Sequence, residues 1–383
     1  MAALSHKIPD RVPATPDISI LIPTRLAGKN FYDDYDLPLA YIEAAEHFGM
    51  DGWMFNGTLG YKYETETEHK TEIIRDTYDF KEIRHTLCTP AGELTAVEFA
   101  PRGAPSTFTE KYVKDFKEDF KKIKFLYPHI TGYDKSVYLK QKKRMGETGV
   151  VCCYIGCPGL QSYFGWMGLE GLTYALYDYP DLFEELTEIV DRYCLRQMEM
   201  AADAGVDSIL TGGSGSITLQ SPELFKKMSL PTIRKVTAMA REAGILSGVH
   251  SCGKEYALVE MCHNGTDLDY VNPLEKHPQG DCDLAGIKQK FGGKLALMGN
   301  LHTTDTMLGS TIKVRLEALK AIRDAGEGGG FVLSTGDQCG YNTPYENIFE
   351  IVQVAKEFGR YPLDMDYISD EIKKLEGDLS ETG

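Results

Sequence analysis

The chain has 383 residues, of which 42% are hydrophobic and 26% charged, as in ordinary globular proteins. Its 41 basic and 57 acidic side chains give a formal net charge of −16, which argues against nucleic acid and anionic membranes as partners. We find no signal-peptide pattern and no apolar run long enough to span a bilayer, and the nine scattered cysteines fit free thiols, so we expect a cytoplasmic protein.

The N-terminal third changes character along its length. Residues 1–17 contain three prolines and little periodicity, which predicts an extended N-terminal arm. An amphipathic helix is predicted over residues 37–48, followed by a short strand over 51–55 that leads to Asn56. From about 58 to 105 the hydrophobic period becomes two, which predicts a β-rich insertion of two to four antiparallel strands. A lysine-rich helix is predicted over 112–126.

After about residue 148, short apolar strands alternate with helices. Strands are predicted over 150–155, 208–210, 246–249, 268–271, 295–298 and 331–333, and helices over 179–204, 222–243, 255–263, 284–291, 312–325 and 344–359. Six strands plus one or two from the N-terminal part predict an α/β fold, the (β/α)8 or TIM barrel. A doubly wound sheet is the competing architecture, but its G-x-G-x-x-G and P-loop signatures do not occur in the sequence. We expect one barrel domain over 18–370 and an acidic tail, a frayed helix, over 371–383.

Residues of the types that commonly bind metals follow the carboxyl ends of these strands. His250 and Cys252 follow the third of the six strands, and Asp337 and Cys339 follow the last. A catalytic zinc takes about three His, Cys or carboxylate ligands and keeps one position open. His250 and Cys252 would supply two of them, and Asp337 or Cys339 the third. The H-x-C spacing alone fits plain packing of these side chains as well.

Seven short motifs, in order, give the region from about 150 to 360 a resemblance to the uroporphyrinogen decarboxylase superfamily. They are GCP at 156–158, SPELF at 221–225, HSCG at 250–253, GDCDL at 280–284, FGGKLALMGN at 291–300, STG at 334–336 and TPYEN at 343–347. The chain is most similar in these motifs to the zinc-dependent, corrinoid-linked methyltransferases, whose fold is a TIM barrel. In those proteins the third zinc ligand is a cysteine six residues before Thr-Pro, and here that position is Asp337. We name both Asp337 and Cys339, with a preference for Asp337 by position.

The resemblance implies methyl transfer from a small O-methyl compound to the cobalt(I) of a separate corrinoid protein. A separate partner is needed because the chain has no corrinoid-binding D-x-H-x-x-G motif. Asn56, Tyr61 and Asn300 are the predicted substrate contacts. An aromatic methyl ether is favoured by the ring residues expected near the barrel mouth, which are Trp53, Tyr61, Tyr63, Tyr163, Phe164 and Trp166. The family also suggests a homodimer.

Three other functions stay open. The first is methyl transfer from a methylcorrinoid protein to a zinc-bound thiol such as coenzyme M. The second is a metal-free lyase of the uroporphyrinogen decarboxylase type, since residues 25–29 (RLAGK) echo the loop that binds carboxylates in that enzyme. Against it, the strand that ends in a catalytic aspartate in the decarboxylase ends here at Asn56. The third is a tetrapyrrole- or corrinoid-binding protein without chemistry.

Overall fold

The computed structural model describes residues 1–30, 33, 35–65 and 67–382, and its centre is a curled parallel sheet. The sheet has seven strands in the order β1-β8-β9-β10-β11-β12-β13. They are β1 (Gly52–Gly57), β8 (Gly149–Tyr154), β9 (Ser208–Gly212), β10 (Leu246–His250), β11 (Tyr270–Asn272), β12 (Ala296–Leu301) and β13 (Phe331–Thr335). The predicted TIM-barrel class is confirmed, and each predicted strand is present within a few residues of its expected bounds.

Residues 12–17 occupy the position between the two outermost strands. Leu333 of β13 donates its N–H to Pro13 O (2.9 Å) and accepts at its carbonyl from Thr15 N (2.8 Å). On the other side, Asp51 N donates to Ala14 O (2.9 Å) next to the start of β1. This segment, expected as part of an arm, is extended but lies within the barrel and links β13 to β1.

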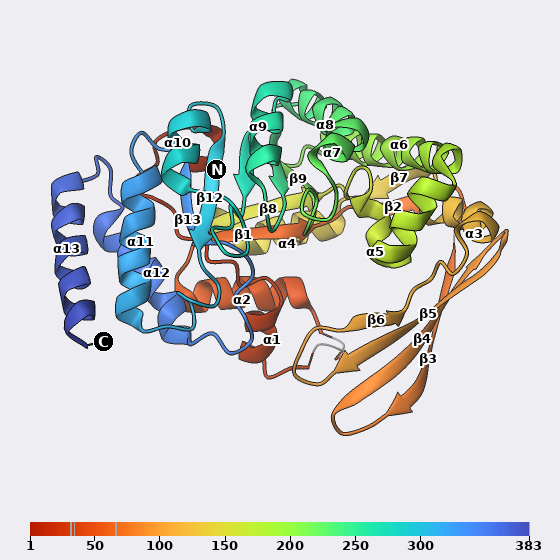
Figure 1. The fold of residues 1–383 in the computed structure, drawn as a ribbon, viewed down its shortest axis with the longest axis horizontal. Helices are drawn as coiled ribbons and strands as arrows, with labels where there is room; N and C mark the ends of the chain where they lie inside the picture. The colour runs from red at the N-terminus through yellow and green to blue at the C-terminus, as the bar shows by residue number, and fades with distance from the viewer. Residues whose placement is uncertain (31–32, 34, 66, 383) are drawn as a thin grey trace.

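Helices cover the outside of the sheet (Figure 1). They are α2 (Leu37–Phe48), α4 (Ser136–Met145), α6 (Pro180–Ala204), α7 (Pro222–Met228), α8 (Leu230–Glu242), α9 (Tyr256–Gly265), α10 (Leu284–Phe291), α11 (Thr311–Ala325) and α12 (Tyr345–Phe358). The helix predicted over 222–243 is two helices, because Pro231 has no N–H to continue α7 and instead occupies the first turn of α8.

Alternate residues of the strands fill two separate apolar layers, as the two-residue period of a strand requires. Ile209, Val249 and Leu297 pack outward against the helices. Inside the barrel, a second buried cluster contains Trp53, Cys152, Leu210, Tyr270 and Met298. Ala3 and Leu4 of the short 3₁₀ helix η1 (Ala3–Ser5) join this inner cluster and cover the amino-terminal end of the barrel.

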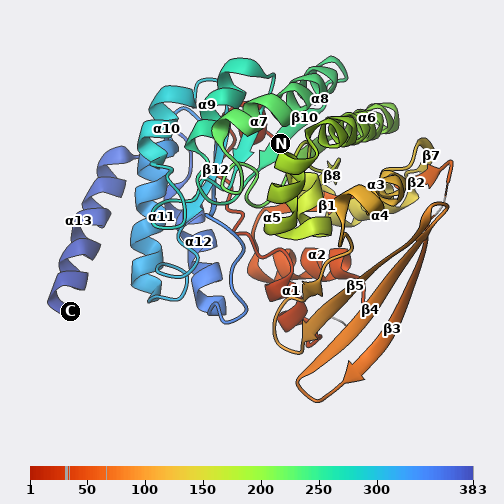
Figure 2. The same ribbon diagram turned by 45° about the vertical axis from the view of Figure 1, so that its right-hand side comes forward.

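The β-rich insertion is larger than predicted and extends from residue 60 to residue 134. A four-stranded antiparallel sheet, β3 (Glu68–Asp76), β4 (Phe80–Thr89), β5 (Gly92–Pro101) and β6 (Thr107–Glu110), projects from the body (Figure 2). A second, two-stranded sheet pairs β2 (Gly60–Tyr63) with β7 (Ile130–Asp134). The predicted lysine-rich helix is α3 (Phe116–Ile123), and α1 (Leu21–Leu26) and α5 (Gln161–Asp178) complete the fold.

The expected acidic tail is part of an ordered helix, α13 (Met365–Thr382). Ile368, Ile372 and Leu375 are buried at helical spacing, and the helix packs beside α11. A frayed end was expected from the acidic composition, but this apolar stripe holds the helix against the barrel. Across the described part of the chain, none of the helices has the length and apolarity needed to cross a membrane.

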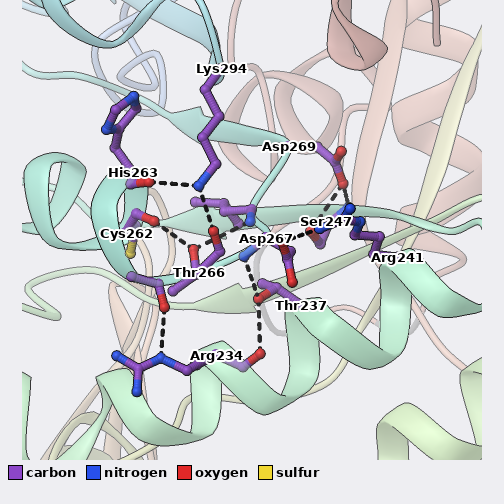
Figure 3. Close-up of polar contacts among 12 residues, drawn as sticks. Arg234, Thr237, Arg241, Ser247, Cys262, His263, Thr266, Asp267, Asp269 and Lys294 are labelled. Atoms are coloured by element: carbon purple, nitrogen blue, oxygen red, sulfur yellow. Dashed lines mark hydrogen bonds and ion pairs between the residues drawn. The ribbon is translucent and has the colours of Figure 1, made fainter.

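A network of polar contacts joins the loops at the amino-terminal end of β10 and β11 (Figure 3). Lys294 Nζ donates to the carbonyl oxygens of His263 and Thr266, both at 2.6 Å. Asp269 accepts from the backbone N of Ser247 at 2.7 Å. This end of a barrel contributes stability, whereas chemistry is carried by the opposite end.

Candidate active site

A cavity of about 270 Å³ lies at the carboxyl ends of the strands, where barrel enzymes place their chemistry. Its walls come from β1, β8, β9 and β10 and from the segments after residue 16 and after β13. The lining residues are Asp17, Ser19, Ile20, Trp53, Phe55, Tyr154, Leu210, Gly212, Gly213, Ser214, His250, Asp337 and Gln338. Larger hollows of about 370 and 690 Å³ lie at the amino-terminal end of the barrel and beside α10 and α11, away from His250.

His250 and Cys252 form a close pair at this cavity. His250 is the last residue of β10, and its Nε2 lies 3.1 Å from Sγ of Cys252. On the other side of the ring, Nδ1 lies 3.3 Å from Oδ1 of Asn272, the last residue of β11. An amide oxygen can only accept, so Nδ1 carries the proton in this contact and Nε2 presents its lone pair to the sulfur. This is the second-sphere arrangement that metal-ligating histidines adopt.

The turn after Cys252 requires glycine. Gly253 has a φ of +95°, and a Cβ at this position would lie 2.2 Å from Oγ1 of Thr218. Its N–H donates to the carboxylate of Glu275. The glycine of the H-x-C-G motif therefore fixes the path of the backbone that presents the sulfur.

Burial keeps the pair uncharged in the free protein. Burial, reinforced by the negative charge of Asp337, raises the pKa of the Cys252 thiol well above its ordinary value. The pKa of His250 is lowered by burial, against the opposing effect of Asp337. A neutral thiol and a neutral imidazole beside carboxylates form a site that a cation would stabilise.

The structure separates the two candidates for the third ligand. Asp337 lines the cavity together with His250. Cys339 is fully buried in the apolar layer between sheet and helices, where its N–H donates to Asp17 O at 2.7 Å. Within the described residues, no group of three or more His, Cys, Asp or Glu side chains is arranged to hold a metal ion. The assignment of either residue as a zinc ligand stays a prediction.

The residues predicted to bind substrate lie outside this cavity. Asn56 is half-buried near the end of β1, and Tyr61 lies in β2, paired with Tyr133 of β7. Asn300 lines the larger hollow beside α10 and α11 and donates to Cys282 O at 3.4 Å. Their predicted substrate contacts stay predictions.

Two aromatic residues of the cavity were missed in the sequence. Of the rings expected at the mouth, Trp53 lines the cavity, while Tyr163 packs in a separate buried cluster. Phe55 and Tyr154 supply the other aromatic walls. Phe55 follows Trp53 by two residues and therefore faces the same side of β1, which the two-residue period could have indicated.

Asp17 is the other residue that sequence reasoning missed. Its backbone N donates to Oγ1 of Thr335 at 3.0 Å, and its carboxylate accepts from the hydroxyl of Ser19. Burial, together with the nearby charge of Asp337, raises the pKa of Asp17 to about 6. The cavity therefore contains a carboxyl group that titrates nearer to neutral pH than an exposed aspartate.

Comparisons with known proteins agree with the barrel fold. Residues 101–358 match the family model described as uroporphyrinogen decarboxylase (URO-D). The uroporphyrinogen decarboxylase of Coxiella burnetii is 24% identical over 196 residues, covering 48% of this chain and 49% of the relative. That of Neisseria meningitidis is 22% identical over 252 residues, covering 63% of this chain and 66% of the relative. In the first of these matches the chain spans about half the relative's length.

One solved structure is similar over nearly the whole chain. A methyltransferase from Methanosarcina mazei has a TM-score of 0.61 and 16% sequence identity, with 93% of this chain and 97% of that chain covered. At this identity the similarity establishes the shared fold.

Proposed function

The chain belongs to the uroporphyrinogen decarboxylase family, as its sequence motifs predicted, and we propose that it is a zinc-dependent methyltransferase. In this proposal a methyl group moves from a small aromatic methyl ether to the cobalt(I) of a separate corrinoid protein. The observation that carries the proposal is the His250–Cys252 pair, whose Nε2 and Sγ atoms face each other at 3.1 Å beside a strand-end cavity. The structural similarity to a methyltransferase over 93% of the chain supports it.

The residues at the cavity include the side-chain types that bind zinc. Imidazole nitrogen, thiolate sulfur and carboxylate oxygen are its usual protein ligands, and three of them leave one position open for substrate. His250 and Cys252 would hold the ion, with Asp337 as the third ligand because it lines the same cavity as His250. Asn272 keeps the His250 ring in the required orientation.

The chemical difficulty of the reaction is the departure of the ether oxygen as an anion. The methyl group would pass to the cobalt(I) of the partner protein as the carbon–oxygen bond breaks, and the oxygen would keep the bonding electron pair and take up a proton. A bound zinc supplies a Lewis acid for that oxygen. Trp53, Phe55 and Tyr154 surround the ring of the donor and keep water away from it. A carboxylate as the third ligand leaves zinc less electron-rich than a second thiolate would, which favours an oxygen donor over transfer to a thiol.

A lyase of the decarboxylase type is the second candidate, and Asp17 is the observation that favours it. The sequence showed Asn56 in place of the expected acid, but Asp17 brings a carboxyl group to the cavity. The charge of the cavity opposes this candidate. Among its described lining residues none is Lys or Arg, and Nη2 of Arg25 donates to Thr343 O at 2.7 Å outside the cavity. Substrate carboxylates would therefore lack a cationic partner, and consumption of a porphyrinogen by zinc-free protein would establish the lyase.

The test of the zinc site is the metal content of the purified and zinc-reconstituted protein. We expect about one zinc per chain, lost in His250→Ala and in Cys252→Ala. Cys88→Ala is the matched control, since Cys88 lies in β4 of the projecting sheet and should leave the zinc content unchanged. No zinc in the intact protein after reconstitution would overturn the proposal.

A further inference from the structure

The cavity has a distinctive balance of aromatic and acidic groups. Trp53, Phe55 and Tyr154 provide ring surfaces, and Asp17 and Asp337 provide two carboxyl groups. None of the described residues that line the cavity is a lysine or an arginine. Its volume of about 270 Å³ lies just below the range of about 300–1,000 Å³ that holds drug-sized ligands, so a single substituted ring is the suitable size.

Asp17 is firmly placed in this wall. The bond from Asp17 N to Thr335 Oγ1 (3.0 Å) and the bond from Cys339 N to Asp17 O (2.7 Å) fix its backbone against the end of β13. The side chain is buried, and its carboxylate accepts hydrogen bonds from the hydroxyl and from the backbone N–H of Ser19. A buried carboxylate with neutral donors from a single residue and no cationic side chain beside it is costly, and a ligand that adds a further donor lowers this cost.

We infer that Asp17 selects the methyl donor by accepting a hydrogen bond from a ring hydroxyl, so that the cavity takes uncharged methoxyphenols and rejects methoxybenzoates. This inference rests on the proposed function and adds the substrate class. A carboxylate on the substrate would face the negative charge of Asp17, because a zinc ion held by the Cys252 thiolate and the Asp337 carboxylate has no net charge left to offset it. A hydroxyl instead supplies the donor that Asp17 lacks.

A methylammonium donor would also suit an aromatic and acidic cavity. The neighbouring His250–Cys252 pair favours the ether, however. An ammonium donor leaves as a neutral amine and needs no Lewis acid, whereas an ether oxygen leaves as an anion and does. Binding of a tetramethylammonium probe more tightly than any methoxyphenol would overturn the inference.

The experiment is a calorimetric binding series on the zinc-loaded protein at pH 7 without cobalt, so that no turnover occurs. The ligands are the three methoxyphenol isomers, methoxybenzene and the three methoxybenzoates. We expect the best methoxyphenol to bind about tenfold or more tightly than methoxybenzene, and each methoxybenzoate to bind more weakly than methoxybenzene. Methoxybenzoates that bind as tightly as the phenols would overturn the inference.

Asp17→Asn tests the residue itself, because it removes the charge and preserves the shape. We expect the preference for phenol over benzoate to fall about tenfold or more. Asp267→Asn, in the polar network at the opposite end of the barrel, is the control and should leave the order of affinities unchanged. An unaltered preference in Asp17→Asn would assign the selection to another group. Should Asp17→Asn not fold, the ligand series on the intact protein still decides whether charge is selected.

The experiments distinguish a failure of the proposed function from a failure of the inference about Asp17. Ligand binding in the expected order, with no methyl transfer to cobalt(I), would refute the methyltransferase and leave the charge selection of the cavity standing. Methyl transfer from phenols and benzoates at equal rates would refute the role of Asp17 and leave the methyltransferase standing.

Discussion

Zinc binding should release about one proton, and that proton should come from Cys252. Burial and the charge of Asp337 hold the pKa of this thiol above its ordinary value, so it is protonated in the free protein at neutral pH. Zinc takes cysteine as thiolate, so the proton must leave when the ion binds. The pKa of His250 is lowered by burial, so this ligand is already neutral and releases none.

The number of protons released follows from the directions of these two pKa shifts. An ordinary cysteine is only a few per cent thiolate at pH 7, and Cys252 must be less ionised than that. The release should therefore be close to one proton from pH 7 to pH 8, and the apparent zinc affinity should rise about tenfold per pH unit over this window. The sign is fixed by the raised pKa: the affinity increases with pH until the thiol itself ionises in the free protein.

The assay is calorimetry of zinc binding in two buffers with different ionisation enthalpies. The difference between the measured heats gives the number of protons released. Cys339→Ala is the control and should still release one, because Cys339 is buried in the apolar layer and does not line the cavity. A release near zero, or a release that disappears in Cys339→Ala, would refute the assignment of Cys252 as a thiolate ligand.

Three further variants test other parts of the account. Asp337→Ala should lower the zinc content measured by elemental analysis, and an unchanged content would exclude Asp337 as the third ligand. Gly248→Ala would place a Cβ 2.1 Å from Cζ of Tyr270 inside the barrel, so thermal unfolding should show a loss of about 1–3 kcal/mol; full stability would contradict the packing. Lys294→Met removes two hydrogen bonds at the amino-terminal end and should cost about 1–3 kcal/mol while zinc binding is retained. Loss of zinc in Lys294→Met would show that this network supports the site.

Periodicity was sufficient to predict most of the fold. The strand and helix alternation after residue 148 is local, so each element could be located from its own residues. Residues 12–17 could not be placed, because their role in the barrel depends on Leu333, which lies far along the chain. The acidic composition at the end of the chain likewise concealed the buried stripe of Ile368, Ile372 and Leu375.

The candidate site could be predicted from the sequence only in part, because it too depends on residues that lie far apart along the chain. His250 and Cys252 were identifiable because the motif places both candidate ligands within three residues, and the structure places His250 Nε2 3.1 Å from Cys252 Sγ. The sequence could not decide which of Asp337 and Cys339 faces the cavity, since the loop after β13 has no regular period. Asp17 was overlooked because it follows a proline-rich segment without periodicity, although it lies beside residues of the last strand.

The most direct test of the central claim is methyl transfer itself. Zinc-loaded protein, a cobalt(I) corrinoid protein and a methoxyphenol should together give methylcobalt(III), seen in the visible spectrum, and one equivalent of the demethylated phenol. The same mixture with His250→Ala should give neither product. Formation of methylcobalt at the full rate with His250→Ala, or its failure with the zinc-loaded protein across the methoxyphenol series, would contradict the account.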